Sequence, residues 1–190
     1  AGAVAGAACL GPTDLSRGIV VTFDNGDTAR MQRMGDGLIE IIETYADGGS
    51  VWRFRARHGV YFVEESELDP RGNPYPGSLL VIDYGLDMAT LPVPVPGGSW
   101  SGETVNIFDD GYRRPEVATY SFSTDAPLML DGCDYEVVRV DVRYDWPDEG
   151  GMTLQYAFLP AIGTAALIMS QLDGDDVLVA QPVSIERLTK

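Results

Sequence analysis

Histidine and lysine are almost absent from this chain of 190 residues, which has one histidine, His58, and one lysine, Lys190. A mechanism that needs two imidazoles is therefore excluded. The sequence also lacks Cys-x-x-Cys, Gly-x-Ser-x-Gly and a glycine-rich phosphate loop before a helix. These absences argue against zinc and thiol redox sites, against hydrolases with a nucleophile elbow, and against nucleotide binding. We expect no cofactor, no bound metal and no enzymatic activity, and we expect His58 to be an ordinary surface or turn residue.

Long hydrophobic runs and positive charge are lacking as well. The longest apolar run, near residues 165–169, is too short to span a bilayer, so no transmembrane segment is expected. Thirteen basic and 29 acidic residues give a formal net charge of −16. A nucleic acid is not an expected partner, because its phosphate backbone attracts positively charged proteins.

Helical periodicity is missing, and alternation with a period of two residues takes its place. The clearest case is 136–145, where Val138, Val140 and Val142 fall on one face while Arg139 and Asp141 fall on the other. Asn-Gly and Asp-Gly pairs between such segments are typical of hairpin turns. The sequence predicts an all-β fold, an antiparallel meander of about 10–12 strands that forms a barrel, half-barrel or sandwich. Short helical turns are expected only near 10–17 and 86–91.

The expected strands follow from this alternation and from the turn signals between them. They lie at 18–23, 28–34, 37–45, 50–57, 59–66, 78–84, 102–108, 112–122, 134–145, 151–159, 164–172 and 176–188. Residues 1–17 are expected to form an N-terminal arm, and residues 18–190 a single β domain. The Pro-rich segment 91–98 would connect two halves of the sheet.

The first residues and the two cysteines indicate a compartment. Small residues at 1–8 resemble the end of a cleaved secretory signal peptide, so we expect a mature, exported, periplasmic protein. Two cysteines in such a protein predict one disulfide, Cys9–Cys133, between the N-terminal arm and the β domain. The alternatives are a boundary inside a longer chain and two buried free thiols in a cytosolic protein.

Three arginines, Arg53, Arg55 and Arg57, share one face of an expected strand. Guanidinium groups at this spacing repel one another unless acids lie opposite them. One interpretation is cross-strand pairing with Glu40 and Glu43 on the preceding strand. The other is a binding site for an anionic head group or an acidic partner.

Segments 37–42, 78–82 and 164–172 are apolar on both faces. Such strands are buried on both sides, by a second layer of sheet, by closure of the sheet or by a ligand. An ordinary core is one interpretation, and an apolar ligand cavity is the other. If a cavity exists, the residues expected near it are Ile39, Ile41, Val81, Leu167 and Met169.

Carboxylates are the only reactive groups that the sequence offers in quantity. A paired-carboxylate hydrolase needs one acid whose pKa is raised in a cleft. Glu64, Glu65 and Glu67 are candidates, although a run of acids at a strand end is usually a solvated face. A cleft that holds two close carboxylates, one of them desolvated, would favour this class.

Three short motifs carry a resemblance in the last third of the chain. They are Cys-Asp-Tyr-Glu-Val-Val-Arg-Val at 133–140, Tyr-Ala-Phe-Leu-Pro-Ala-Ile-Gly at 156–163 and Ile-Glu-Arg-Leu at 185–188. This part resembles exported β-rich proteins of unknown function from alphaproteobacteria. The predicted meander is also similar to the lipoprotein-carrier-like half-barrels of the periplasm. That likeness implies a curved sheet that holds acyl chains.

The function expected from these observations is that of a non-enzymatic binding or interaction protein of the cell envelope that uses apolar surface. Its partner would be an envelope protein or an apolar or amphiphilic small molecule. The alternatives are a periplasmic lipid or lipoprotein carrier and a carboxylate-dependent hydrolase. The sequence leaves the oligomeric state open.

Overall fold

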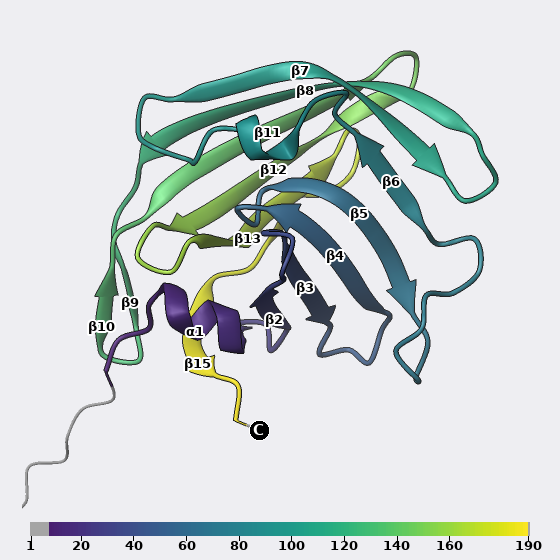
Figure 1. Cartoon of the computed structure of the whole chain (residues 1–190). Helices are drawn as coiled ribbons and strands as arrows, with labels where there is room; N and C mark the ends of the chain where they lie inside the picture. Colours follow the sequence, from purple (N-terminus) through teal and green to yellow (C-terminus); the bar gives the residue numbers. More distant parts are fainter. Residues whose placement is uncertain (1–7, 190) are drawn as a thin grey trace, which may run out of the picture.

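The computed structural model describes residues 8–189, and its main element is one antiparallel sheet of 13 strands. The all-β prediction is confirmed (Figure 1). The strands of this sheet are β1 (Ile19–Phe23), β2 (Thr28–Arg33), β3 (Ile39–Thr44), β4 (Val51–Arg57), β5 (Tyr61–Leu68), β6 (Leu80–Asp83), β7 (Ser99–Phe108), β8 (Arg113–Thr124), β11 (Val138–Trp146), β12 (Gly150–Leu159), β13 (Thr164–Leu172), β14 (Leu178–Val179) and β15 (Pro182–Arg187).

Most strands pair with their neighbours in sequence, as expected for hairpins. The turn between β1 and β2 shows why, because Gly26 adopts a φ of 86° that favours glycine at this position. Two pairings are exceptions, that of β1 with β15 and that of β8 with β11. The segment between β8 and β11 forms a separate small hairpin of β9 (Leu128–Leu130) and β10 (Cys133–Tyr135), which the alternation did not predict, so the strand expected at 134–145 is divided between β10 and β11.

The sheet curls around an interior without closing into a barrel (Figure 1). Its two edges are β14 and β15, which follow one another in the chain but do not pair. Residues 180 and 181 cross between them, so the single strand expected at 176–188 is divided. Ala180 donates its N–H to Ile168 on β13 at 3.1 Å, and Gln181 accepts from Asp24 after β1 at 2.9 Å. The C-terminal segment therefore bridges both edges.

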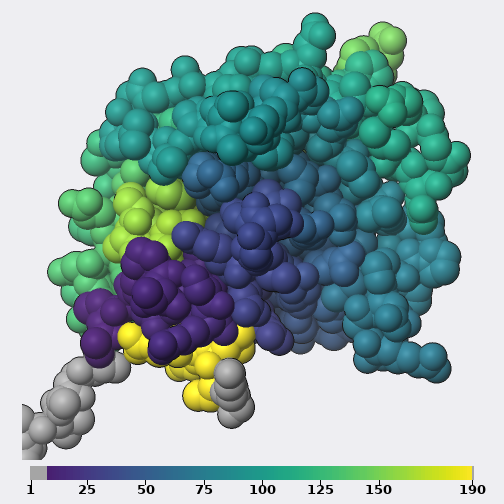
Figure 2. Space-filling model, viewed as in Figure 1, coloured from purple at the N-terminus to yellow at the C-terminus, as the bar shows by residue number. Residues whose placement is uncertain are grey.

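The helical content is limited to short turns, as predicted. Helix α1 (Pro12–Arg17) buries Leu15 completely, and η1 (Met88–Thr90) is a single 3₁₀ turn. Asp14 of α1 accepts a 2.7 Å bond from Arg187 of β15. Figure 2 shows the purple N-terminal segment against the yellow C-terminal segment. Within residues 8–189, no helix has the length and apolar character to cross a membrane.

Two groups of buried side chains fill the interior. One joins α1, β1–β3, the β9–β10 hairpin and β15, and the other joins β5–β8 with β11. Strands β12 and β13 contribute to both, because Ala157 and Ala166 belong to the first group while Tyr156 and Ala165 belong to the second. The start of β13 is thus buried on both faces, as the sequence of 164–172 predicts. In β3, only the face of Ile39 and Ile41 is fully buried.

A disulfide joins Cys9 to Cys133 across 124 residues. The bond attaches the segment before α1 to β10. The hydroxyl of Tyr135 also accepts the N–H of Leu10, at 2.9 Å. The predicted pairing is confirmed, whereas residues 1–7, on which the expected signal-peptide remnant falls, lie outside the described residues.

Candidate functional site

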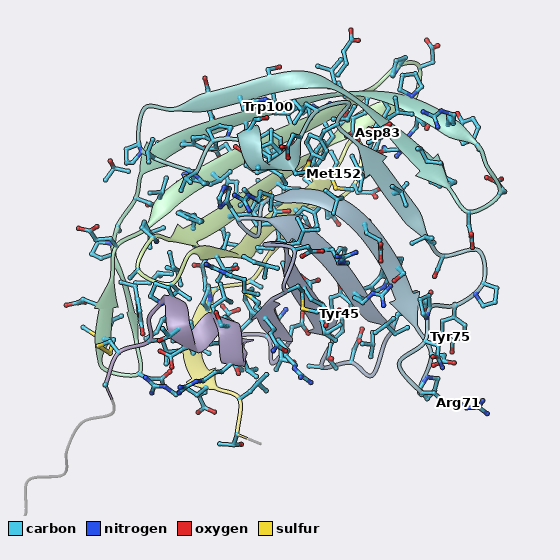
Figure 3. The ribbon with its side chains drawn as sticks, viewed as in Figure 1. Tyr45, Arg71, Tyr75, Asp83, Trp100 and Met152 are labelled. Carbon is cyan, nitrogen blue, oxygen red and sulfur yellow. A yellow bond between two sulfur atoms is a disulfide. The ribbon has the colours of Figure 1, made fainter. Side chains whose placement is uncertain are left out.

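A cavity of about 360 Å³ lies inside the curled sheet. Tyr45 and Met152, which Figure 3 labels, line it from the end of β3 and from β12. Every strand from β3 to β8 and from β11 to β13 contributes to its wall. The residues of this inner cavity are Glu43, Tyr45, Phe54, Phe62, Glu65, Leu80, Ile82, Asn106, Arg114, Glu116, Tyr144, Trp146, Met152, Leu154, Tyr156, Leu167 and Ser170. Most of them are apolar or aromatic, as in ligand sites of other proteins.

A second cavity of about 340 Å³ adjoins the first and shares Glu43, Tyr45, Leu167 and Ser170 with it. We call it the outer cavity. The outer cavity lies between the β1–β2 turn, the end of β3 and strands β13 and β14. Its rim carries exposed apolar side chains, since Leu178 of β14 is 68% exposed and Val179 is 60% exposed. The two cavities therefore have part of their walls in common, and Leu167 is the apolar residue of that shared part.

Glu116 is the most deeply held acid of the inner cavity, with 5% of its surface exposed. On β8 it follows the alternation of Ala118 and Tyr120, which points these residues inward. Its Oε1 accepts a 2.7 Å bond from Thr104, and its Oε2 accepts bonds of 3.0 Å from Asn106 and 2.6 Å from Trp146. Both carboxylate oxygens of Glu116 are therefore occupied. The buried charge is stabilised by these donors.

Glu65 on β5 is different, because among residues 8–189 no group donates a hydrogen bond to its carboxylate. Burial and the neighbouring charges of Glu116 and Glu43 together raise its pKa to about 7, against the opposing effect of Arg114. Burial also raises the pKa of Glu43, which accepts a 3.1 Å hydrogen bond from Tyr45. Three carboxylates therefore share one interior space, and one of them is desolvated and unpartnered.

One cation balances these acids in part. Arg114 of β8 lies with its guanidinium carbon 4.0 Å from the ring centre of Trp146, and it forms a 3.1 Å ion pair with Glu149. Within the described part of the chain, its buried Nε has no hydrogen-bond partner. The inner cavity thus has an excess of negative charge, with the single guanidinium bound to an acid outside the cavity wall.

Tyrosines supply further polar groups. The hydroxyls of Tyr84, Tyr120 and Tyr144 form a chain with spacings of 3.2 and 2.8 Å, which ends at the cavity with Tyr144. Tyr156 is 3% exposed and has no partner for its hydroxyl among residues 8–189. Burial raises the pKa of all four phenols, so they stay protonated at neutral pH.

Of the apolar residues expected near a cavity, Leu167 lines both cavities and Met169 lines the outer one. Ile39 and Ile41 lie in the core below α1, with 1% and 3% of their surface exposed, and line neither cavity. Val81 alternates with Leu80 and Ile82, which line the inner cavity, so it lies on the other face of β6.

The arginines expected to form an anion site lie on the face of β4 opposite Phe54. Arg53 pairs with Glu64 of β5 at 2.9 Å, and Arg55 pairs with Glu64 at 3.6 Å and with Asp36. The acids that pair with them are therefore not Glu40 and Glu43. Arg57 donates to the carbonyl of Gly37 at 3.3 Å. Acidic side chains and a backbone carbonyl therefore compensate most of the positive charge of these three arginines. None of the three lines the inner or the outer cavity.

A third cavity, about 780 Å³, lies between the Pro-rich segment 93–96, the turn between β12 and β13, and His58. His58 occupies a turn with a φ of 54° and is half-buried. Burial and the charges of Arg57 and Arg33 lower its pKa to about 4. His58 is therefore neutral at physiological pH and does not supply a positive charge to this cavity.

The inner cavity combines features that sequence reasoning assigned to different classes. Its carboxylates Glu43 and Glu116 were not among the predicted site residues, although Glu65 was considered as a candidate acid. The alternation on β8 could have placed Glu116 inward, and the alternation of Ile39 and Ile41 could have placed Glu43 there as well.

Residues 8–189 contain no group of three or more His, Cys, Asp and Glu side chains suited to a metal ion. The chain matches no protein-family model, and no curated protein or solved structure matches it either. The resemblance to exported alphaproteobacterial proteins therefore stays a prediction.

Proposed function

We propose that this protein is a non-enzymatic binding protein of the cell envelope that holds an apolar or amphiphilic small molecule inside its curled sheet. The observation that supports this proposal is the adjoining pair of cavities, each within the range of about 300–1,000 Å³ usual for ligand sites. A periplasmic carrier of lipids or lipoproteins would be one form of this function.

The apolar residues of the cavities support an alkyl or aromatic ligand. Leu167 lies where the outer and inner cavities meet, and Phe54 and Phe62 stand in the inner wall. Burying a ligand chain against such side chains contributes about 25 cal/mol for each Å² of apolar surface removed from water. The exposed Leu178 and Val179 at the rim offer a first contact for an apolar molecule or a protein partner that delivers it.

The disulfide supports the envelope part of the proposal. Disulfides persist in oxidising compartments such as the bacterial periplasm and are rare in the cytosol. The bond between Cys9 and Cys133 fixes the segment before α1 against β10, which stabilises the end of the sheet where α1 lies.

Titration with an environment-sensitive apolar dye tests the proposal. The wild type should bind the dye saturably, and Leu167→Glu should weaken binding at least tenfold because it places a charge where the cavities meet. Leu172→Glu is the matched control, since Leu172 lies on the same strand, is 42% exposed and lines neither cavity. If Leu167→Glu does not fold, Met169→Glu probes the outer cavity. Dye binding only after unfolding would contradict the proposal.

A carboxylate-dependent hydrolase is the second candidate, and the raised pKa of Glu65 favours it. An acid with a pKa of about 7 can act as a general acid at neutral pH. The second carboxylate is less suitable, because hydrogen bonds occupy both oxygens of Glu116. Turnover of a chromogenic ester or glycoside that is lost in Glu65→Gln would establish this class, and no turnover would leave the binding function.

A further inference from the structure

Two hydrogen-bond acceptors of the inner cavity, on Glu65 and Asn106, have no donor among residues 8–189. The carboxylate of Glu65 receives no hydrogen bond from residues 8–189. Asn106 is 2% exposed and donates to Glu116 at 3.0 Å, yet its Oδ1 has no partner in the described chain. Buried acceptors of this kind cost free energy until a donor satisfies them.

The charges in the inner cavity also favour a ligand that donates hydrogen bonds and is positively charged. Glu43, Glu65 and Glu116 face the interior, whereas Arg114 is the one cation among the residues that line it. Arg114 already has two partners, since it stacks on Trp146 and pairs with Glu149. A positively charged group of a ligand would therefore be attracted, and a negatively charged one repelled.

The aromatic groups complete such a site. Phe62 packs against Tyr156 with ring centres 5.9 Å apart, and the Tyr156 hydroxyl has no partner among residues 8–189. Aromatic faces attract ammonium groups as well as alkyl chains. The apolar wall around Leu167 is then available for the rest of the ligand.

From this arrangement we infer that the ligand is a cationic amphiphile, an alkyl chain that ends in an ammonium group, with the ammonium bound between Glu65, Asn106 and Tyr156. This inference rests on the proposed function and specifies its ligand class. The alkyl chain extends past Leu167 toward the outer cavity. Binding of the cation offsets the repulsion among the three carboxylates, which Arg114 balances only in part.

Calorimetric titration with a matched series tests this inference. Decylammonium, decanol and decanoate share one chain and differ in head group. At pH 8, where Glu65 is largely ionised, the wild type should bind decylammonium at least tenfold more tightly than decanol and should bind decanoate most weakly. Concentrations stay below micelle formation, so that detergent effects do not enter.

Two variants separate charge from packing. Glu65→Gln should lose most of the preference for decylammonium while it keeps the affinity for decanol, and Glu43→Gln should reduce the preference in part. Glu103→Gln is the control, because it removes the same charge from an exposed position on β7.

The outcomes distinguish the inference from the proposed function. Equal binding of all three molecules, tighter binding of decanoate, or an unchanged preference in Glu65→Gln would overturn the cationic ligand and leave a general apolar site. Binding of none of the three would overturn both.

Discussion

The indole Nε1 of Trp146 donates a 2.6 Å hydrogen bond to Oε2 of Glu116, and this bond links the end of β11 to β8 inside the cavity. The same indole carries the guanidinium of Arg114 on its face. Trp146 therefore positions both a carboxylate, Glu116, and a guanidinium, Arg114, in the cavity wall.

Replacement of Trp146 should measure this linkage. Trp146→Phe keeps an aromatic ring but removes the donor, and it should lower the free energy of unfolding by about 1–3 kcal/mol, because Glu116 is buried. Denaturant unfolding gives the value. The control is Trp52→Phe, at a half-buried Trp that stacks on Phe54. Equal losses in the two variants would show that the hydrogen bond contributes nothing.

The pKa of Glu65 predicts a pH dependence of stability. It is about 7 in the folded protein against an ordinary value of 4.5, so the folded state holds this proton more tightly than the unfolded state. The contribution of Glu65 to stability is therefore fully present below pH 4.5 and is lost as the pH rises through 7. A shift of this size corresponds to a loss on the order of 3 kcal/mol.

Glu65→Gln should remove that pH dependence. The variant should gain stability relative to the wild type between pH 5 and pH 8, with unfolding free energies measured in denaturant at each pH. Comparison with the wild type cancels the titration of groups that both proteins share. A difference between variant and wild type that stays constant over this range would contradict the raised pKa.

The disulfide should be a large part of the stability. A crosslink across 124 residues stabilises by roughly 4–5 kcal/mol in the chain-entropy model. The double variant Cys9→Ser, Cys133→Ser should lose about this amount in denaturant unfolding, and reductant should then have no further effect. Thiol titration of the denatured, unreduced wild type should find no free thiol. Two free thiols for each chain would contradict both the bond and the argument for an oxidising compartment.

The arginine stripe should be structural. Arg55 is partly exposed and pairs with Glu64 and Asp36, so Arg55→Gln should cost no more than about 1 kcal/mol in the free energy of unfolding. It should also leave dye binding unchanged, because Arg55 does not line the cavities. Vesicle sedimentation with anionic lipid tests whether the arginines form an anion-binding site. Vesicle binding by the wild type that is abolished in Arg55→Gln would show that they do and would contradict a purely structural role.

Alternation predicted most of the fold, because a strand with one buried face repeats every two residues. The hairpin of β9 and β10 was missed, since each strand has three residues and cannot show a repeat. The division of 176–188 into β14 and β15 was also missed. It depends on which edge each half reaches after the sheet has curled.

The residues that line the cavities were harder to predict from the sequence than the strands. Leu167 and Met169 were placed near it, because a strand that is apolar on both faces must be buried twice. Ile39 and Ile41 have the same sequence character, but α1 and the β9–β10 hairpin cover their region of the core. Glu65 and Glu116 come from strands that are distant in sequence, and only the curl of the whole sheet brings their charges into one interior.

The most direct test uses a variant whose single remaining tryptophan lies in the wall of the inner cavity. The chain has three Trp residues, and Trp52→Phe with Trp100→Phe leaves Trp146 in the wall of the inner cavity. Titration with a decylammonium that carries bromine on its chain should then quench the fluorescence of Trp146 saturably, with one molecule bound for each chain. Quenching that is absent, or that rises linearly without saturation, would contradict a ligand site inside the sheet.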